Sequence, residues 1–356
     1  MLELSNVNFT LGNFSLRNIS FKVEKGEILV ILGLSGSGKT TLLNTILGIY
    51  KPTSGKIIYN NEDITKKPIN KRNIAFVPQS LLLYPHMTVY ENIEYGLKLQ
   101  NIKKEEREKR INEILEFMQL ETKKDYYPHM ISGGEKQKVS IARAFVLRSP
   151  LILMDEPLTN IDLPKRSEIL KLIKDLQKRF KKTIIYVTHQ LAEASCLATK
   201  VAIMENGSII RIGTVMELLH DPQKIFIAEL LNFENIFPAR ILRKNGKTIA
   251  EIENNGKKVN IQLTGTYEAD DVVTITIRPE DLMISTNPLE SISARNCLKG
   301  QIKEIVENLE GTIKIRVDCG IMLTALITRT SFEELKLKKG SDVYLIFKAT
   351  AVKIIE

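Results

Sequence analysis

Two kinds of hydrophobic pattern follow one another along the chain. In the first part, segments of helical period alternate with short apolar runs that are typical of buried strands: residues 27–32, 74–79, 151–154 and 183–187. Beyond residue 236, short segments alternate between apolar and polar residues, and turn residues separate them. The pattern predicts an α/β domain over residues 1–220, a linker over 221–235 and an all-β, barrel-like domain over 236–356.

Smaller features subdivide both domains. Residues 2–24 alternate as a pair of strands, and a helical subdomain of about residues 86–150 interrupts the α/β domain. The all-β domain contains a weak internal repeat, in which ADDVVTITIRPED parallels GSDVYLIFKATAV. Two related halves therefore form either one small barrel or a tandem pair.

A glycine-rich loop connects the first buried strand to the first helix. Residues 33–40, GLSGSGKT, match the phosphate-loop pattern G-x-x-x-x-G-K-[ST] without a mismatch. Backbone N–H groups and the positive end of a helix dipole meet at such a loop, and its glycines let the chain curl around phosphates. Lys39 can reach the β/γ-phosphate oxygens, and the Thr40 hydroxyl can bind Mg²⁺. The loop predicts a nucleoside triphosphate site.

Polar side chains follow three further buried strands. Asp155 and Glu156 end the run at 151–154, Gln79 ends the run at 74–79, and His189 follows 183–187. Since ligands bind at the carboxyl ends of parallel strands, one carboxylate can hold Mg²⁺ and the next can orient the attacking water. We expect Gln79 to help hold the cation and the water, and His189 to contact the γ-phosphate. The alternative for the two acids is a strand that merely ends in an acidic turn.

Two weaker candidates accompany these groups. Ser132, Gly133 and Gly134 precede a helix and would expose N–H donors suited to phosphate, although a serine at a helix N-terminus is common. An aromatic ring from the N-terminal strand pair could stack on adenine, with Phe14 as the candidate and Phe9 as the alternative. Each of these rings, taken alone, is more often a core residue.

Composition narrows the setting. The net charge is +9, but no basic run is interleaved with aromatic residues, so we expect no nucleic-acid partner. Three scattered cysteines, Cys196, Cys297 and Cys319, are expected to be buried reduced thiols of a cytosolic protein. We expect neither an export signal nor a membrane span, because the first residues lack a basic region followed by an apolar one and no apolar run approaches roughly 20 residues. Any link to a membrane is therefore expected to run through another protein.

The first part resembles the nucleotide-binding subunits of ATP-binding cassette (ABC) transporters. GLSGSGKT, Gln79, ISGGEKQ, LILMDEP, Asn160-Ile161-Asp162 and His189 stand in that family's order over about residues 1–220. The resemblance implies an ATPase of the P-loop NTPase class with ATP and Mg²⁺ as cofactors. It departs at Ile131 and Glu135, which replace the ends of the usual Leu-Ser-Gly-Gly-Gln, and Asp162 alone is kept from Ser-Ala-Leu-Asp.

The resemblance also implies roles for single residues. ATP contacts are expected from three segments: the phosphate loop, the family's signature segment (here ISGGEKQ, residues 131–137) and the loop after the acids. The expected residues are Gly33, Ser35, Gly36, Ser37, Gly38, Lys39, Thr40, Thr41, Ser132, Gly133, Gly134 and Asp162, with Phe14 on the adenine. Mg²⁺ would be bound by Thr40, Gln79 and Asp155. Catalysis would rest on Glu156, which polarises the attacking water, with His189, Gln79 and Lys39.

Partners follow from the same resemblance. In this family ATP lies between the phosphate loop of one subunit and the signature of another, so one copy of each predicts a homodimer with two ATP sites. Integral membrane permease subunits would hold it at the cytoplasmic face of the cell membrane as a peripheral protein, and an extracytoplasmic substrate-binding protein would act indirectly. Docking candidates are Tyr84, His86, Met87 and Val89, and the alternative for each is packing inside the helical subdomain.

The C-terminal domain resembles a TOBE, Mop-type module, an OB-like fold that binds molybdate or tungstate at the end of molybdate importer ATPases. The resemblance rests on SARNCLKG (293–300) and FKATAV (347–352), which are rich in donors and contain no carboxylate, as suits a tetrahedral dianion. It implies an oxyanion site between paired modules that stops transport when substrate is plentiful, built from Ser293, Ala294, Arg295, Asn296, Lys348, Ala349 and Thr350. The alternative is a purely structural dimerising barrel.

The function expected from these resemblances is ATP-driven import of molybdate or tungstate with C-terminal feedback inhibition. One alternative keeps the machine and changes the cargo to sulfate, iron, a sugar or a polyamine. The other is a soluble ABC ATPase that acts on nucleic acid or ribosomes. Molybdate and tungstate are dianions of nearly equal size, so the sequence predicts no preference between them.

Overall fold

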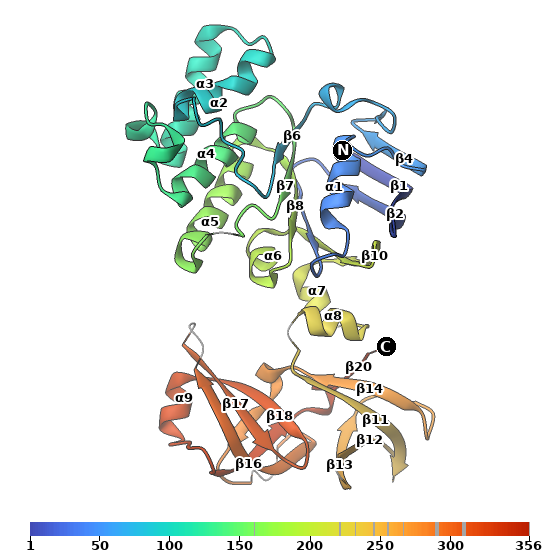
Figure 1. Cartoon of the computed structure of the whole chain (residues 1–356). Coiled ribbons are helices and arrows are strands. Elements are labelled where there is room, and N and C mark those ends of the chain that lie inside the picture. Colours follow the sequence, from blue (N-terminus) through green and yellow to red (C-terminus); the bar gives the residue numbers. More distant parts are fainter. Residues whose placement is uncertain are drawn as a thin grey trace. The chain divides into compact units, whose positions relative to one another are not determined.

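The computed structural model divides the chain into two compact units, Met1–Met216 and Glu217–Glu356 (Figure 1). It describes residues 1–159, 161–220, 222–231, 233–244, 246–254, 256–265, 267–288, 292–307 and 311–355. The division falls inside helix α7 (Val215–His220). Each unit has its own cluster of buried apolar residues.

The first unit is built around a six-stranded sheet in the order β10-β9-β3-β8-β7-β6. All neighbours in it are parallel except the β9–β10 pair. Every residue of the three central strands is buried, which confirms the predicted apolar strands and is typical of a parallel sheet covered on both faces. The strands are β3 (Ile28–Leu32), β6 (Ile74–Val77), β7 (Leu151–Asp155), β8 (Thr183–Thr188), β9 (Lys200–Glu205) and β10 (Ser208–Gly213).

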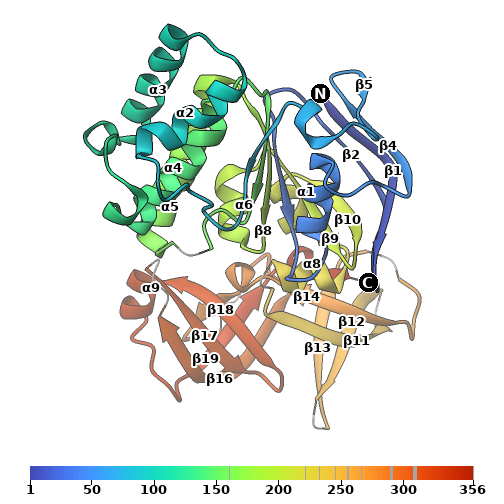
Figure 2. The same ribbon diagram turned by 45° about the horizontal axis from the view of Figure 1, so that its top comes forward.

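A second, antiparallel sheet packs against the first through one shared core (Figure 2). Its order is β2-β1-β4-β5, with β1 (Leu2–Leu11), β2 (Phe14–Val23), β4 (Ser54–Tyr59) and β5 (Glu62–Asp63). The predicted strand pair at residues 2–24 is confirmed, because Leu2 pairs with Val23 and Leu11 pairs with Phe14. This register places Phe14 at the start of β2, next to the hairpin turn.

Helices cover the six-stranded sheet and extend from it (Figure 1). They are α1 (Lys39–Leu47), α2 (Val89–Leu99), α3 (Lys104–Met118), α4 (Gly133–Phe145), α5 (Leu163–Phe180) and α6 (Leu191–Leu197). The apolar face of α3 consists of four buried residues, Ile111, Ile114, Leu115 and Met118. Arg72 is 2% exposed and donates to the Thr45 and Ile46 carbonyls at the end of α1, which secures the helix that begins in the phosphate loop.

The second unit contains two five-stranded sheets that exchange their last strands. The orders are β13-β12-β11-β14-β20 and β15-β19-β16-β17-β18, so the final strand of each repeat joins the other half. All pairs are antiparallel, and both sheets share one buried cluster. The elements are α8 (Ile225–Leu230), β11 (Asn235–Lys244), β12 (Lys247–Asn254), β13 (Lys257–Leu263), β14 (Val272–Ile277), β15 (Met283–Ser285), β16 (Asn296–Glu307), β17 (Thr312–Asp318), β18 (Met322–Thr328), α9 (Arg329–Glu334), β19 (Asp342–Phe347) and β20 (Lys353–Ile355).

Two buried asparagines join the halves in a symmetric way. Asn235, at the start of β11, accepts from the Thr324 N–H at 2.6 Å and donates to the Thr324 carbonyl at 2.8 Å. Asn296, at the start of β16, accepts from the Gln262 N–H at 2.7 Å and donates to the Gln262 carbonyl at 2.9 Å. Each amide satisfies a backbone donor and acceptor of the opposite half, so the repeat continues into the side-chain contacts.

Two sequence-based expectations differ from the structure. Residues 221–235 were predicted to be a linker, but they include α8, which buries Ile227 and Ala228 because the apolar run in this segment forms a helix face. The cysteines were expected to be buried, but Cys297 is exposed at an outward-facing position of β16, and Cys196 and Cys319 are half-buried. The described cysteines are free thiols, as expected.

We expect Asn235→Ala and Asn296→Ala each to lower the free energy of unfolding by about 2 kcal/mol, because each leaves a buried N–H and C=O without a partner. Urea unfolding of the full chain, followed by circular dichroism, measures the loss. Asn260→Ala, on the exposed side of β13, is the matched control. An Asn235→Ala or Asn296→Ala variant as stable as the wild type would contradict the stabilising role of these two amides.

Candidate functional site

The glycine-rich loop is shaped by close contacts that only glycine permits. Gly38 has φ 104°, and a Cβ there would lie 2.3 Å from the Phe14 ring. A Cβ on Gly33 would lie 2.3 Å from the Met204 carbonyl oxygen. The ring of Phe14 and the end of β9 therefore pack directly against the loop.

The loop forms one wall of a cavity of about 310 Å³. Nine residues line it: Phe14, Ser35, Gly36, Gly38, Lys39, Thr40, Thr41, Gln79 and Glu156. All nine are candidates from the sequence, and β2, α1, β6 and β7 bring them together. Gly33 and Ser37 are absent from this lining and are buried in the loop instead. Phe9 is also in the core, where its ring stacks on Tyr50 at 4.9 Å, so Phe14 is the aromatic residue at the cavity.

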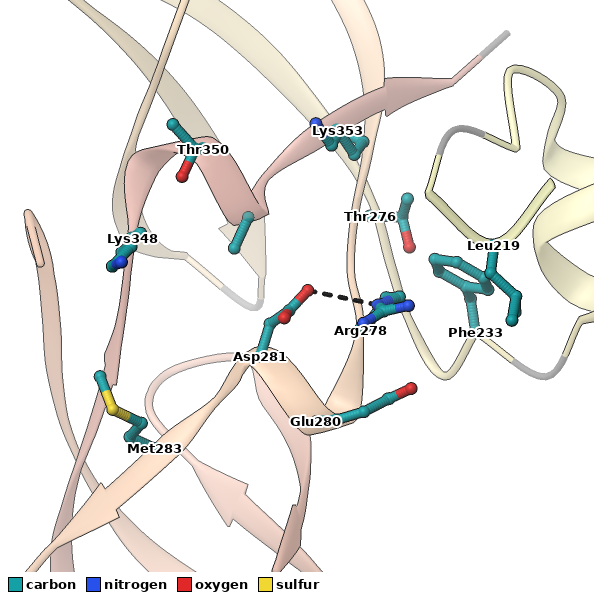
Figure 3. Close-up of a pocket in the computed structure, with 11 residues that line it drawn as sticks. Leu219, Phe233, Thr276, Arg278, Glu280, Asp281, Met283, Lys348, Thr350 and Lys353 are labelled. Atoms are coloured by element: carbon teal, nitrogen blue, oxygen red, sulfur yellow. Dashed lines mark hydrogen bonds and ion pairs between the residues drawn. The ribbon is translucent and has the colours of Figure 1, made fainter. Parts of the chain in front are cut away.

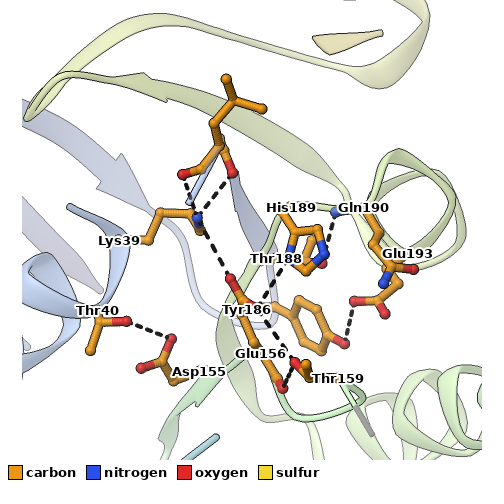
Figure 4. Close-up of polar contacts among 12 residues, drawn as sticks. Lys39, Thr40, Asp155, Glu156, Thr159, Tyr186, Thr188, His189, Gln190 and Glu193 are labelled. Atoms are coloured by element: carbon orange, nitrogen blue, oxygen red, sulfur yellow. Dashed lines mark hydrogen bonds and ion pairs between the residues drawn. The ribbon is translucent and has the colours of Figure 1, made fainter. Parts of the chain in front are cut away.

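Lys39, Glu156 and His189 form a chain of polar contacts beside this cavity (Figure 4). The Lys39 ammonium donates to the Gly33 and Leu34 carbonyls at 2.9 Å and lies 3.6 Å from Glu156 Oε1. The other oxygen of Glu156 is 3.1 Å from His189 Nδ1. Burial lowers the pKa of Lys39, and the Glu156 carboxylate opposes that change. The ammonium and the carboxylate thus stabilise each other where triphosphate oxygens would compete for the ammonium.

Asp155 and Thr40 are the second pair. The Thr40 hydroxyl donates to Asp155 Oδ1 at 3.1 Å. Burial raises the pKa of the Asp155 carboxyl above its ordinary value, and the Thr40 hydrogen bond only partly opposes the rise. The hydroxyl, this carboxylate and the Gln79 carboxamide offer the oxygen ligands that Mg²⁺ prefers, so these residues fit the cation. A bound dication would also offset the cost of burying the ionised Asp155.

Glu156 is held in an unfavourable backbone conformation. Its φ is 39°, a region that non-glycine residues seldom adopt. Its N–H donates to the Val187 carbonyl at 3.0 Å, and the Thr159 hydroxyl donates to its carbonyl at 2.9 Å. These contacts hold the backbone of Glu156 on two sides, and Lys39 and His189 contact its carboxylate. Thr159 was not a candidate from the sequence, and no motif pointed to this hydrogen bond.

The Ser-Gly-Gly segment lies elsewhere on the same unit. The Ser132 hydroxyl accepts from the Glu135 N–H at 3.3 Å, and the Glu135 carboxylate accepts from the Ser132 N–H at 2.7 Å. This reciprocal capping box gives Glu135 a reason to stand where the usual signature has Gln. A Cβ on Gly133 would meet nothing within 4 Å, so this helix N-terminus is open. The phosphate-loop cavity is not lined by Ser132, Gly133 or Gly134.

Asp162 is also an exposed residue outside that cavity. It precedes α5, and its carbonyl accepts from the Arg166 N–H at 2.9 Å. Asn160 lies outside the described residues. The candidates near the phosphate loop therefore lie together at and beside one cavity, whereas Ser132, Gly133, Gly134 and Asp162 do not line it.

The candidates for docking a partner divide into core and surface. Val89 is 1% exposed and belongs to the core of the helical subdomain. Tyr84 is half-buried, with its ring 4.8 Å from that of Tyr95 and 4.9 Å from the Arg143 guanidinium. His86 is exposed and Met87 is half-buried. A largely apolar cavity of about 250 Å³ adjoins them, lined by Phe76, Pro78, Leu81, Leu82, Asn92, Tyr95, Gly96, Ser140, Arg143, Ala144 and Leu147.

The C-terminal candidates occupy one end of the β16–β19 pair. Asn296 pairs with Phe347, so Arg295 and Lys348 extend directly from neighbouring strands. Lys348 and Thr350 are exposed on a cavity of about 390 Å³ (Figure 3). Ser293 and Arg295 are exposed, Ala294 is half-buried, and Ala349 is buried. The Asn296 amide is committed to Gln262, as described above.

The equivalent segment of the first repeat differs in charge. There, residues 278–281 read Arg-Pro-Glu-Asp, and the Arg278 guanidinium lies 3.3 Å from Asp281. The second-repeat segment, residues 348–351, has no acid at any of these positions. The second-repeat segment therefore carries no carboxylate of its own, while Glu280 and Asp281 of the first repeat line the same cavity as Lys348 and Thr350.

Family models match both units. One described as "ABC transporter" matches residues 16–159, and one described as "TOBE domain" matches residues 292–354. None of the helices within the described ranges is both long and apolar enough to cross a membrane.

Curated relatives match nearly the whole chain. The molybdate/tungstate import ATP-binding protein WtpC of Pyrococcus abyssi is 39% identical over 99% of this chain and 100% of its own length. The protein of the same name from Pyrococcus horikoshii is 38% identical over 99% of both chains. The Fe(3+) ions import ATP-binding protein FbpC of Vibrio cholerae is 39% identical over 81% of both chains.

Solved structures match about three fifths of the chain. CbiO1 from Clostridium perfringens, part of an ABC transporter complex, is 30% identical with a TM-score of 0.58 and covers 62% of this chain and 91% of its own. The ATP-binding cassette MJ0796, a dimer with ADP and Pi in a post-hydrolysis state, is 32% identical with a TM-score of 0.54 and covers 60% of this chain and 99% of its own.

We expect Asp155→Asn to raise the melting temperature of the nucleotide-free protein by a few degrees at neutral pH. A raised pKa in the folded state means that ionised Asp155 destabilises the fold above that pKa, and the penalty fades as the pH falls through it. The gain from the substitution should therefore shrink on acidification.

The same variant should lose most of the extra thermal stability that Mg²⁺ adds to the complex with a non-hydrolysable ATP analogue. Differential scanning fluorimetry with Mg²⁺ or EDTA measures both effects. Asp125→Asn, at an exposed carboxylate, is the control. A full Mg²⁺ increment in Asp155→Asn would remove Asp155 from the cation site.

Proposed function

Since the chain belongs to the family of ABC transporter ATP-binding subunits, we propose that it hydrolyses ATP to drive import of molybdate or tungstate. The observation that carries the cargo is the match to molybdate/tungstate importers over both units, 99% of the chain. The Fe(3+) ions import ATP-binding protein of Vibrio cholerae matches 81% of it. The donor-rich segments at 293–296 and 348–350, which contain no carboxylate, support the same cargo.

In the proposed ATP site, the phosphates lie along residues 35–41, where N–H groups and the start of α1 face the cavity. Lys39 exchanges its contacts with the Gly33 and Leu34 carbonyls for β/γ-phosphate oxygens. Phe14 packs at the adenine end, where its ring already touches Gly38. When bound, Mg²⁺ supplies positive charge that neutralises the phosphates, and Thr40, Asp155 and Gln79 would hold it.

Glu156 is proposed to orient and polarise the attacking water. When Lys39 turns to phosphate, Glu156 Oε1 becomes free to accept a hydrogen bond from water, while Oε2 keeps its contact with His189. His189 is 38% exposed, so its ring can also reach a γ-phosphate oxygen. The strained but well-supported backbone at Glu156 keeps this carboxylate in place.

Two copies are proposed to complete the site. Ser132, Gly133 and Gly134 form an open helix N-terminus that one chain does not direct into its own cavity. A second copy would bring this segment and its Asp162 to the γ-phosphate, giving two ATP molecules in a symmetric dimer. The dimeric cassette among the solved relatives supports this arrangement.

The membrane contact is proposed to be peripheral, at the cytoplasmic face. The apolar cavity beside Leu81, Leu82 and Tyr95, with Tyr84, His86 and Met87 next to it, would receive a short helix from a permease subunit. Val89 is excluded from this contact by its burial. A substrate-binding protein outside the membrane would act through the permease.

Regulation is proposed to lie at the end of the β16–β19 pair. Ser293, Arg295, Lys348 and Thr350 would donate to a tetrahedral oxyanion through side chains, and Ala294 and Ala349 through backbone N–H groups. Asn296 would support the site through its clamp on Gln262 and would keep one amide hydrogen for the ligand. Accumulated substrate would then lower ATP turnover.

We expect molybdate and tungstate on the cytosolic side of the reconstituted transporter to lower ATP turnover about 10-fold, and sulfate at equal concentration to leave it unchanged. Lys348→Ala should need much more oxyanion for the same inhibition, because it removes one of two cations at the site. Lys303→Ala, elsewhere on β16, should behave as wild type. Inhibition by sulfate alone, or by iron or polyamine alone, would contradict the proposed cargo.

A further inference from the structure

A largely buried arginine connects two loops of the first unit, the one before Asp162 and the one after His189. Arg166 lies in the first turn of α5, four residues after Asp162, and its side chain is 13% exposed. Its Nη2 donates to the Ile161 carbonyl at 3.1 Å. Its Nη1 donates to the Gln190 side chain, the residue that follows His189. One planar guanidinium thus binds the segment before Asp162 and the segment after His189.

A buried carboxylate anchors the same guanidinium to the central sheet. Glu193, in α6, has a side chain that is 4% exposed, and its Oε1 lies 3.7 Å from Arg166 Nη1. Its Oε2 accepts a hydrogen bond from the fully buried Tyr186 hydroxyl at 2.9 Å (Figure 4). Burial raises the pKa of Tyr186 well above its ordinary value, so the phenol remains a donor. Tyr186 belongs to β8, which ends at Thr188, directly before His189.

The contacts form a continuous path toward the water-orienting acid. It runs from the Ile161 carbonyl through Arg166 to Gln190, and His189 beside Gln190 contacts Glu156 at 3.1 Å. Arg166 is absent from the lining of the phosphate-loop cavity. The path therefore positions His189 and the segment that carries Asp162. Arg166 itself makes no contact in the nucleotide cavity.

We propose that Arg166 is a positioning residue that couples the Asp162 segment to the His189 segment. This role rests on the proposed two-copy site. When a second copy docks against Asp162, the contact is transmitted through Ile161 and Arg166 to His189 and Glu156. The coupling operates once the second copy has completed the ATP site. It therefore acts on the rate of ATP hydrolysis and leaves ATP affinity unchanged.

Removing Arg166 alone would confuse two effects, because it leaves the buried Glu193 carboxylate without its cation. The double variant Arg166→Met/Glu193→Gln removes that charge and keeps an amide that can accept from Tyr186. It should melt close to the wild type, keep KM for ATP within about twofold, and lower kcat about 10-fold to 100-fold. Thermal melting, steady-state ATPase kinetics and ATP binding measure these quantities.

A second variant leaves no buried charge without its partner. Gln190→Ala removes one end of the link, and it should lower kcat with KM unchanged, by less than the double variant. Arg179→Met, at the far end of α5, breaks only an exposed pair with Glu113 and should match the wild type. A merely structural role predicts that the double variant regains wild-type kcat along with stability, and that result would overturn the proposal.

The failure of the proposed function looks different. It would be a wild-type protein without ATP turnover, whereas failure of this inference is a wild-type kcat in the double variant of a protein that does hydrolyse ATP. A rise in KM at constant kcat would also overturn it, because that outcome assigns Arg166 to nucleotide binding.

Discussion

The register of three parallel strands is the constraint on which the site depends. Leu32 of β3 pairs with Thr188 of β8, and Asp155 of β7 pairs with Val187 of the same strand. The phosphate loop, the two acids and His189 therefore leave the sheet at one level, and their side chains lie 3.1 to 3.6 Å from one another. A shift of one residue in either pairing would reverse the faces on which these side chains lie. The fully apolar strands set this register because each is buried on both faces.

That geometry concentrates charge in a place that has little water. Lys39 and Asp155 are each 4% exposed, and their pKa values move in the directions that disfavour their charges. In the free chain, Glu156 and two backbone carbonyls satisfy Lys39, while Thr40 satisfies Asp155. A triphosphate with its cation offers each group a stronger partner. The same burial that destabilises the empty site thus favours the occupied one.

Much of this could be predicted from the sequence, because the phosphate loop and the acids adjoin short apolar runs whose strand character is unambiguous. The aromatic residue could be placed only by the structure, since Phe9 and Phe14 stand on the same strand pair and only packing against Gly38 distinguishes them. Asn296 fitted an anion-binding pattern, but its partner Gln262 is 34 residues away on the other half of the repeat. Thr159 and Arg166 belong to no pattern, because their roles arise from contacts between loops that fold independently.

The account rests on one carboxylate, and one variant tests it most directly. Glu156→Gln keeps the shape of the side chain but removes its capacity to accept a proton from the attacking water. For this variant, the rate of ATP hydrolysis should be measured together with the molar mass of the protein in the presence of ATP, which shows whether two chains are associated. The account predicts turnover at least about 100-fold below wild type, with ATP still bound and held in a stable dimer of two chains. Turnover near the wild-type rate by a variant that still binds ATP would contradict it.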